Sequence, residues 1–147
     1  MSFDSLFTTA NISASGLSAE RYRMEVVANN IANAFTTRTS EGGPYRRRDV
    51  IFEEVLNTNL RHTPRGVEPL GGVRIAGTEP DQSTEFPRIL NPGHPDADAN
   101  GYVTLPNVQL PLEMVNLITA NRAYEANLKV LQAFRQQTDQ ALQLLRS

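Results

Sequence analysis

The sequence predicts an α+β fold, in which long antiparallel N- and C-terminal helices form a coiled-coil-like pair and a small, turn-rich β region is inserted between them. At both ends of the 147-residue chain, residues suited to a helix seam recur at alternating spacings of three and four, as in helices that pack along one stripe. All nine prolines lie from Pro44 to Pro111, and proline interrupts helices. We therefore expect a terminal helical domain, residues 1–36 plus 107–147, and an outer region, residues 37–106.

The N-terminal helix is predicted from two interleaved rows of residues, each with a seven-residue repeat. One row runs through Phe3, Ala10, Leu17, Met24 and Ile31, and the other through Leu6, Ser13, Glu20, Val27 and Ala34. The segment TTRTSEGG, residues 36–43, then ends the helix, because threonine, serine and glycine are poor helix formers.

Short extended segments are predicted in the proline-rich middle of the chain. Residues 45–56 include the β-favouring run Val50–Phe52, and residues 67–76, 88–90 and 102–105 offer further short strands. Turn-forming residues separate these segments, so the strands should be brief.

The C-terminal helix should begin between residues 107 and 112, since Pro111 suits a first helical turn and Glu113 follows it. A seam with three- and four-residue spacing then predicts one face that packs against another helix. Its members are Met114, Leu117, Asn121, Tyr124, Leu128, Leu131, Arg135, Thr138, Leu142 and Leu145. We expect Tyr124 and Leu128 to be buried in the helix pair.

Composition excludes several classes of function. The net charge of −2 and the absence of cysteine argue against a nucleic-acid surface and exclude disulfides, thiolate catalysis and sulfur-based zinc sites. The helical ends are nearly neutral, whereas residues 41–109 carry ten acidic and seven basic side chains. No segment approaches the length of about 18 apolar residues that spans a membrane, and no cleaved signal peptide of the usual type is expected.

A partial calcium loop is the first candidate for chemistry. Asp96, Asp98, Asn100 and Gly101 match its first ligands and its turn glycine, but Asn107 stands where a closing glutamate is required. An Asx-rich turn before a strand is the alternative that we favour, while a secreted calcium-binding module remains an open hypothesis.

Other candidate sites are weaker still. A hydrolase built around His94 and Asp96 is a third hypothesis, although solvated loop positions are expected for His94 and for His62. The run from Arg46 to Arg48 alternates faces if it forms a strand, so Arg46 and Arg48 should point the same way from a solvated edge. No catalytic constellation, metal site or cofactor is expected, which places the function on surfaces.

Two terminal stretches resemble the signatures of bacterial flagellar axial proteins of the rod and hook class. The first runs from Ser15 to Ala34 and includes ANNIANA, and the second runs from Met114 to Asn127 and includes ANRAYEAN. The middle segments GGPYRR and NPGHPDADANGYV are most similar to a proximal-rod member of that class. Phe35 departs from the family pattern, which usually continues with a polar residue.

The resemblance implies a structural, non-enzymatic subunit of the flagellar basal-body proximal rod. Such a subunit would polymerise helically through its terminal helices into a hollow drive shaft around the export channel. Its partners would be itself, other rod proteins, the adaptor between rod and membrane ring, the membrane ring and the flagellar type III export apparatus. No nucleic acid or small-molecule substrate is implied. The rod spans the periplasm, and its subunits are exported without signal cleavage.

In such a tube each terminal helix must contact several neighbours, where small residues allow close approach and asparagines can hydrogen-bond between helices. The residues that we expect at subunit interfaces are Leu17, Met24, Val27, Asn29, Asn30, Ile31, Asn33, Met114, Leu117, Asn121, Tyr124, Asn127, Leu128, Leu131 and Leu142. Asn116 belongs to the same set of candidate hydrogen-bonding asparagines.

Overall fold

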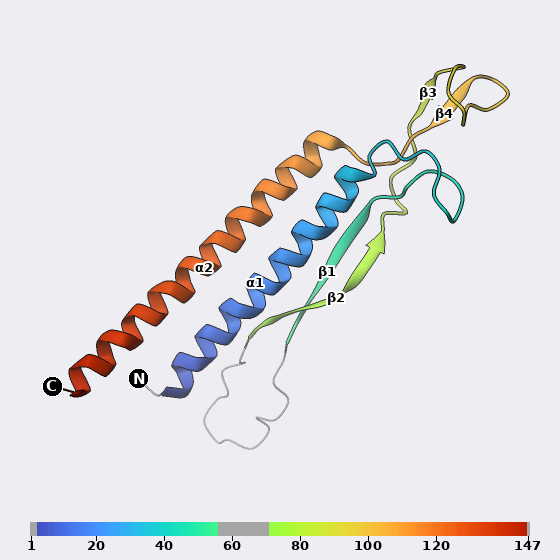
Figure 1. The fold of residues 1–147 in the computed structure, drawn as a ribbon. Coiled ribbons are helices and arrows are strands. Elements are labelled where there is room, and N and C mark those ends of the chain that lie inside the picture. The colour runs from blue at the N-terminus through green and yellow to red at the C-terminus, as the bar shows by residue number, and fades with distance from the viewer. Residues whose placement is uncertain (1–2, 56–70, 147) are drawn as a thin grey trace. The chain divides into compact units, whose positions relative to one another are not determined.

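The computed structural model describes residues 3–55 and 71–146, with side chains from residue 10 to 55 and from 71 to 144. Figure 1 shows the elements in chain order. They are α1 (Phe3–Ala32), β1 (Arg48–Glu54), β2 (Val73–Pro80), β3 (Arg88–Leu90), β4 (Tyr102–Thr104) and α2 (Leu110–Arg146). The predicted α+β class is confirmed. Neither helix, over the part of the chain described, is apolar enough to span a membrane.

The predicted strands are largely confirmed. β1, β3 and β4 fall inside the expected segments, whereas β2 begins at Val73 and continues beyond the expected end to Pro80. The first four residues of that prediction, 67–70, lie outside the described residues. β1 pairs with β2, and β3 pairs antiparallel with β4 in a separate two-stranded sheet, with Ile89 opposite Val103.

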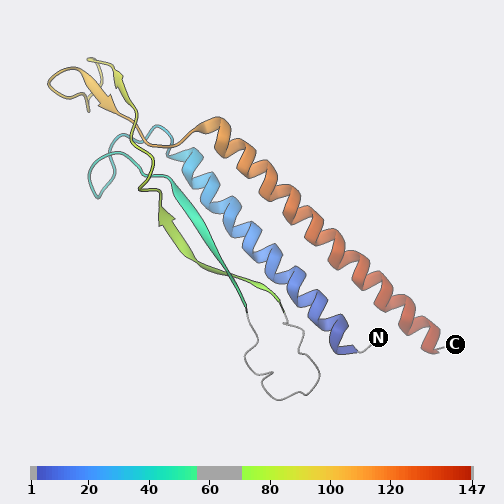
Figure 2. The same ribbon diagram turned by 180° about the vertical axis from the view of Figure 1, so that it is seen from behind.

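The chain divides into two compact units, and each helix contributes to both of them. One unit comprises Met1–Tyr22, Phe52–Ala76 and Ala120–Ser147, and the other comprises Arg23–Ile51 and Gly77–Thr119. In Figures 1 and 2 the N-terminal part of α1 lies beside the C-terminal part of α2, both within the first unit.

Within the first unit, α1 contacts α2 and the start of β2. A Cβ atom added at Gly16 would lie 2.9 Å from the Asn127 side-chain nitrogen, so the two helices approach closely at this point. The Ser15 hydroxyl accepts a hydrogen bond of 3.1 Å from the backbone N–H of Val73.

Within the second unit, Asn30 joins the end of α1 to β1 and to the start of α2. Its side-chain nitrogen donates to the Arg48 carbonyl at 2.8 Å and to Glu113 at 3.0 Å. Within this unit the end of α1 therefore meets the first turn of α2, as an antiparallel pair requires.

Both predicted rows of α1 are covered where their side chains are described. Ser13, Val27 and Ala34 are buried, and Ala10, Leu17, Glu20, Met24 and Ile31 are half-buried. The Phe3 and Leu6 side chains lie outside the described residues. Ala19, Val26 and Asn30 are buried as well, so α1 is covered over more of its circumference than a single stripe requires.

Candidate functional site

The face that α2 turns inward differs by one row from the predicted seam. Leu117, Tyr124, Leu131 and Thr138 are half-buried as part of a continuous stripe, but Met114, Asn121, Leu128, Arg135 and Leu142 are exposed. The expected burial of Leu128 is wrong, since this side chain is 39% exposed. The Leu145 side chain lies outside the described residues.

The second row of the true seam consists of Glu113, Ala120, Asn127 and Phe134, which are buried or half-buried. These residues also alternate with the Leu117 row at spacings of four and three. Two members of this row suit a helix contact, because short side chains let two helices pack tightly. Ala120 is small, and Asn127 lies close to Gly16 of α1. Reading the seam from the larger apolar residues selected the wrong row.

Exposed apolar residues, one of them from the predicted seam, form a face on the first three turns of α2, within the second unit. Leu112, Met114, Val115 and Ile118 are between 49% and 58% exposed. At the helical angle of about 100° per residue they lie on the side of α2 opposite Glu113, Leu117 and Ala120. Contiguous exposed apolar surface is a common feature of interaction sites. We call these four residues the α2 apolar face.

The first unit has exposed apolar residues on α2 too. Leu128, Val130, Leu142 and Leu144 are all exposed. Phe35, the departure from the family pattern, follows α1 in the second unit and is 73% exposed. Large apolar side chains thus face solvent in both units, at positions that would be costly to leave uncovered in an assembly.

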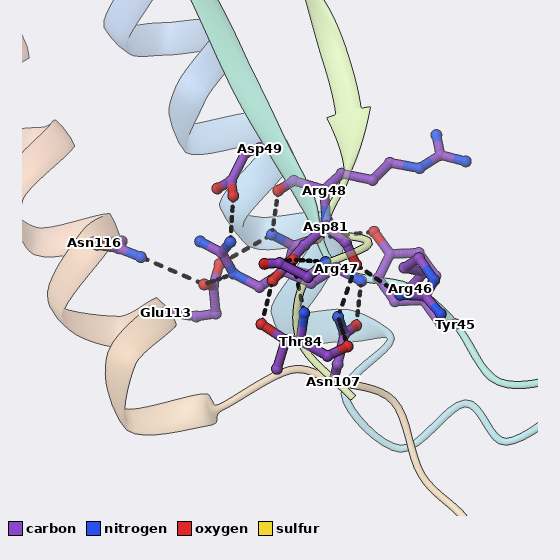
Figure 3. A network of polar contacts seen from close by, with 12 residues as sticks. Tyr45, Arg46, Arg47, Arg48, Asp49, Asp81, Thr84, Asn107, Glu113 and Asn116 are labelled. Atoms are coloured by element: carbon purple, nitrogen blue, oxygen red, sulfur yellow. Dashed lines mark hydrogen bonds and ion pairs between the residues drawn. The ribbon is translucent and has the colours of Figure 1, made fainter. Parts of the chain in front are cut away.

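A buried polar network fixes the end of α1 in the second unit (Figure 3). Asn30 is 0% exposed. Its side-chain oxygen accepts hydrogen bonds from the Tyr45 hydroxyl at 2.9 Å and from the Arg48 backbone N–H at 3.0 Å. With the two bonds that its nitrogen donates, the amide uses its full hydrogen-bonding capacity. Asparagine is therefore required here by local geometry.

Glu113 brings α2 into the same network. Its carboxylate is 0% exposed and accepts hydrogen bonds from Arg47 Nε at 2.7 Å, from Asn30 at 3.0 Å and from Asn116 at 3.3 Å. Figure 3 shows Arg47 between Glu113 and Asp49, and Arg47 also donates to Asp49. A buried charge is tolerated when it is paired and hydrogen-bonded, as Glu113 is.

The network changes the protonation equilibria of two members. Burial disfavours the charged form of Arg47, but the hydrogen bonds to Glu113 and Asp49 outweigh it and raise the pKa of the guanidinium. Burial also raises the pKa of the Tyr45 phenol, although the positive charge of Arg48 acts in the opposite direction. Both groups are held in the protonation state that the hydrogen bonds require.

Asn107 ties the segment before α2 to the network. Its side-chain oxygen accepts a hydrogen bond of 2.8 Å from the Arg47 backbone N–H, and its nitrogen donates to the Asp81 carbonyl at 3.1 Å. Sequence reasoning missed Arg47, Glu113 and Asn107 as a group. The solvated edge expected for the arginine run is wrong for Arg47, whose side chain is 15% exposed.

The predicted interface residues of α1 have different environments. Val27 and Asn30 are buried, Leu17, Met24, Ile31 and Asn33 are half-buried, and Asn29 is exposed. Among the candidate asparagines, Asn29 and Asn33 donate to carbonyls of their own helix, and Asn121 donates to Glu125 on α2. In the described structure, side-chain contact with the other helix is made by Asn30 and by Asn127.

The calcium-loop residues already have other partners. Asp98 accepts hydrogen bonds from the backbone N–H groups of Asn100 and Tyr102 and pairs with Arg88. These contacts, above all the bond from Tyr102, lower the pKa of the Asp98 carboxyl. The Asp96 carboxylate accepts a hydrogen bond from Thr37. The described residues contain no cluster of metal-ligating side chains, and the favoured Asx-rich turn accounts for the segment.

The histidines add little to a catalytic hypothesis. His94 accepts a hydrogen bond of 3.1 Å through Nδ1 from the backbone N–H of Asp96, so this nitrogen has a structural role in the turn. The Asp96 carboxylate is bound by Thr37 instead of His94. His62 lies outside the described residues.

Comparison with known proteins places these features in a family. Residues 11–38 match the family described as Flagella basal body rod protein, and residues 99–144 match the family described as Flagellar basal body rod FlgEFG protein C-terminal. The two matched segments include most of α1 and most of α2.

Curated relatives match over nearly their whole length. The flagellar basal-body rod protein FlgC of Borreliella burgdorferi is 42% identical, with 95% of this chain and 97% of the relative aligned. The FlgC proteins of Bacillus subtilis and Salmonella typhimurium are 37% and 39% identical, and the alignments cover 94% and 86% of this chain. The chain therefore belongs to the FlgC family of flagellar basal-body rod proteins.

Proposed function

We propose that this protein is a non-enzymatic subunit of the flagellar proximal rod that polymerises helically through its terminal helices. In this proposal residues 1–36 and 107–147 build the wall of a hollow shaft around the export channel. Residues 37–106 form its outer region. Family membership supports the rod, and the α2 apolar face supports assembly through the helices.

The α2 apolar face is the observation that carries the proposal. Four large apolar side chains are about half exposed on the side of the helix that faces away from the seam. A chain that worked alone would leave this surface in water, whereas a neighbouring subunit would bury it and gain about 25 cal/mol for each Å² covered. The predicted interface residues Met114, Leu128 and Leu142 are exposed, as contact with another subunit requires.

The same proposal specifies partners and location. We infer contacts with other copies and other rod proteins, with the adaptor and the membrane ring, and with the type III export apparatus that delivers the subunit without signal cleavage. The assembled rod would span the periplasm and transmit torque. Half-buried Leu17, Met24 and Ile31 of α1 support contacts with more than one neighbour.

Sedimentation of the purified chain from micromolar to millimolar concentration, with helicity followed by circular dichroism, tests the proposal. We expect polymer to form above a threshold concentration and helicity to rise with it, because terminal turns rich in threonine and serine are stabilised by packing. Ile118→Ser should raise the threshold, while Gln132→Ser, an exposed polar change on the same helix, should not. A compact monomer of constant helicity throughout would contradict the proposal.

A further inference from the structure

A polar pocket in the second unit has no part in the helix packing. Its volume is about 450 Å³, and it is lined by the loop Thr39–Arg46 together with Arg48, Pro80 and Phe86. Gly42 and Gly43, at the rim, have φ angles of +88° and +75°, which favour glycine. Among the described residues, apart from the adjacent ones in the chain, no atom lies within 4 Å of a Cβ atom added at either glycine. The rim is therefore open to a visiting group.

Arg46 forms a fixed wall of this pocket. Its guanidinium donates to the Asp81 carbonyl at 2.7 Å and lies 4.2 Å from the centre of the Phe86 ring. A backbone hydrogen bond and a cation–π contact hold the planar group in one orientation. Its positive charge is paired with no carboxylate among the described residues.

Arg48 supplies a second positive charge. Its backbone N–H and C=O bind Asn30 in the buried network, which anchors the residue. Its exposed side chain has no hydrogen bond or ion pair with any residue that the structure describes, and Figure 3 shows it extending away from the network. Arg46, just before β1, and Arg48, its first residue, both line the pocket, while Arg47 between them donates to Glu113.

Two guanidinium groups beside one pocket suit an anionic group such as a carboxylate, because a planar fork of N–H donors matches the two carboxylate oxygens. The single acidic lining residue, Glu41, is exposed on the rim loop. We propose that the pocket between Arg46 and Arg48 binds an acidic side chain from the outer region of a second copy of this chain. This inference rests on the proposed assembly and names one of its contacts.

Charge complementarity favours a second copy as the source of the carboxylate. The outer region, residues 37–106, carries ten acidic and eight basic side chains, so each copy brings an excess of acidic groups to its neighbour. Glu54, Glu79 and Glu85 are exposed and have no hydrogen bond or ion pair with other described residues. These three carboxylates are the candidates that we test for binding in the pocket of a second copy.

The test compares the assembly thresholds of full-chain variants in which either Arg48 or Arg74 has lost its positive charge. We expect Arg48→Gln to raise the threshold at least threefold, and Arg48→Glu to raise it at least tenfold, at low salt. Arg74→Gln, which neutralises an exposed arginine of β2 already paired with Glu53, should leave the threshold within twofold. Because the Arg48 hydrogen bonds to Asn30 are made by its backbone and not by its side chain, circular dichroism of the Arg48 variants should match that of the wild type.

Charge exchange identifies the source of the carboxylate. Chains carrying Arg48→Glu are mixed with chains carrying Glu54→Lys, Glu79→Lys or Glu85→Lys, and one mixture should recover the wild-type threshold. Wild-type behaviour of Arg48→Glu, with normal assembly of the unmodified chain, would overturn the pocket inference and leave the proposed function standing. A raised threshold that none of the three mixtures restores would overturn the assignment to a second copy. Failure of the unmodified chain to assemble would overturn both proposals.

Discussion

The two long helices have similar seam spacing but differ in how much of their surface is covered. α1 contacts α2 and β2 in the first unit, and α2 and β1 in the second. Among its described side chains, the one large apolar residue left exposed is Ile12. α2 buries one stripe and exposes a row of large apolar residues. Under the proposed assembly, this difference means that α1 contributes more to the subunit's own packing and α2 offers more apolar surface to other subunits.

Breaking the buried ion pair should have the largest effect on stability. Glu113→Ala leaves Arg47 without its buried partner and Asn30 with an unused donor. We therefore expect the free energy of unfolding to fall by about 3–5 kcal/mol. Chemical denaturation measures this change. Asp49→Ala removes the exposed partner of the same arginine and should cost less than about 1 kcal/mol. Equal losses for the two variants would show that burial is not what makes the Glu113 contact important.

Shortening a covered apolar residue of α1 should have a smaller effect than breaking the ion pair. Val27 is buried, and Val27→Ala removes two methyl groups and leaves a cavity. We expect a loss of about 2 kcal/mol in the free energy of unfolding, measured by urea denaturation at a concentration below the assembly threshold. A loss below about 0.5 kcal/mol would contradict the view of α1 as the covered helix.

Enlarging a side chain at a close contact between the helices, in the first unit, tests how the helices pack there. Gly16→Leu places a large side chain against Asn127, and we expect a loss of about 1.5 kcal/mol from overpacking. Adding Asn127→Ala to Gly16→Leu should return part of this loss, because the second change opens space at the same point. Additive effects in the double-mutant cycle would mean that the two residues do not share a contact.

Changing the exposed face of α2 should affect stability least and assembly most. Ile118→Ser alters a side chain that is already half in water, so the free energy of unfolding of the monomer should change by less than about 0.5 kcal/mol. Its effect on the assembly threshold should nevertheless exceed that of Gln132→Ser. Large destabilisation by Ile118→Ser would indicate that this face is part of the subunit's own core.

Acid should weaken the turn between β2 and β3 through Asp81. The Ser83 and Thr84 hydroxyls and backbone N–H groups bind this carboxylate and hold its pKa well below the ordinary value of 3.8. A depressed folded-state pKa stabilises the fold above the unfolded-state pKa, and this contribution is lost as pH falls through the folded-state value. The midpoint temperature of thermal unfolding should fall as the pH is lowered from about 5 to about 2. It should fall less in the Asp81→Asn variant. Parallel curves for the two proteins would contradict this role.

The sequence predicted the elements better than the contacts between them. Seven-residue spacing located both helices, because periodicity depends on the chain alone. The choice between the Met114 row and the Glu113 row depended on Asn30 and Arg47, which are distant in sequence. Size and apolarity favoured Met114, but a buried glutamate becomes acceptable once three donors surround it. That information appears only when the β region is folded against the helices.

The arginine run shows the same limit on a smaller scale. Strand alternation placed Arg46 and Arg48 on one face and Arg47 on the other, as the structure confirms. It could not tell which face meets a carboxylate, because Glu113 is far along the chain. The Asp98 turn was more predictable, since its backbone partners are four residues away or nearer.

The network around Asn30 has a mechanical consequence. Apolar surfaces can slide past one another with little loss of contact, but a hydrogen bond fails once its atoms separate by a fraction of its length. In the second unit, shear between α1 and α2 must strain the bond from Asn30 to Glu113. The bonds from Asn30 to Tyr45 and to the Arg48 backbone keep its amide from turning to follow Glu113. We therefore expect this end of the helix pair to resist shear more strongly than an apolar contact would.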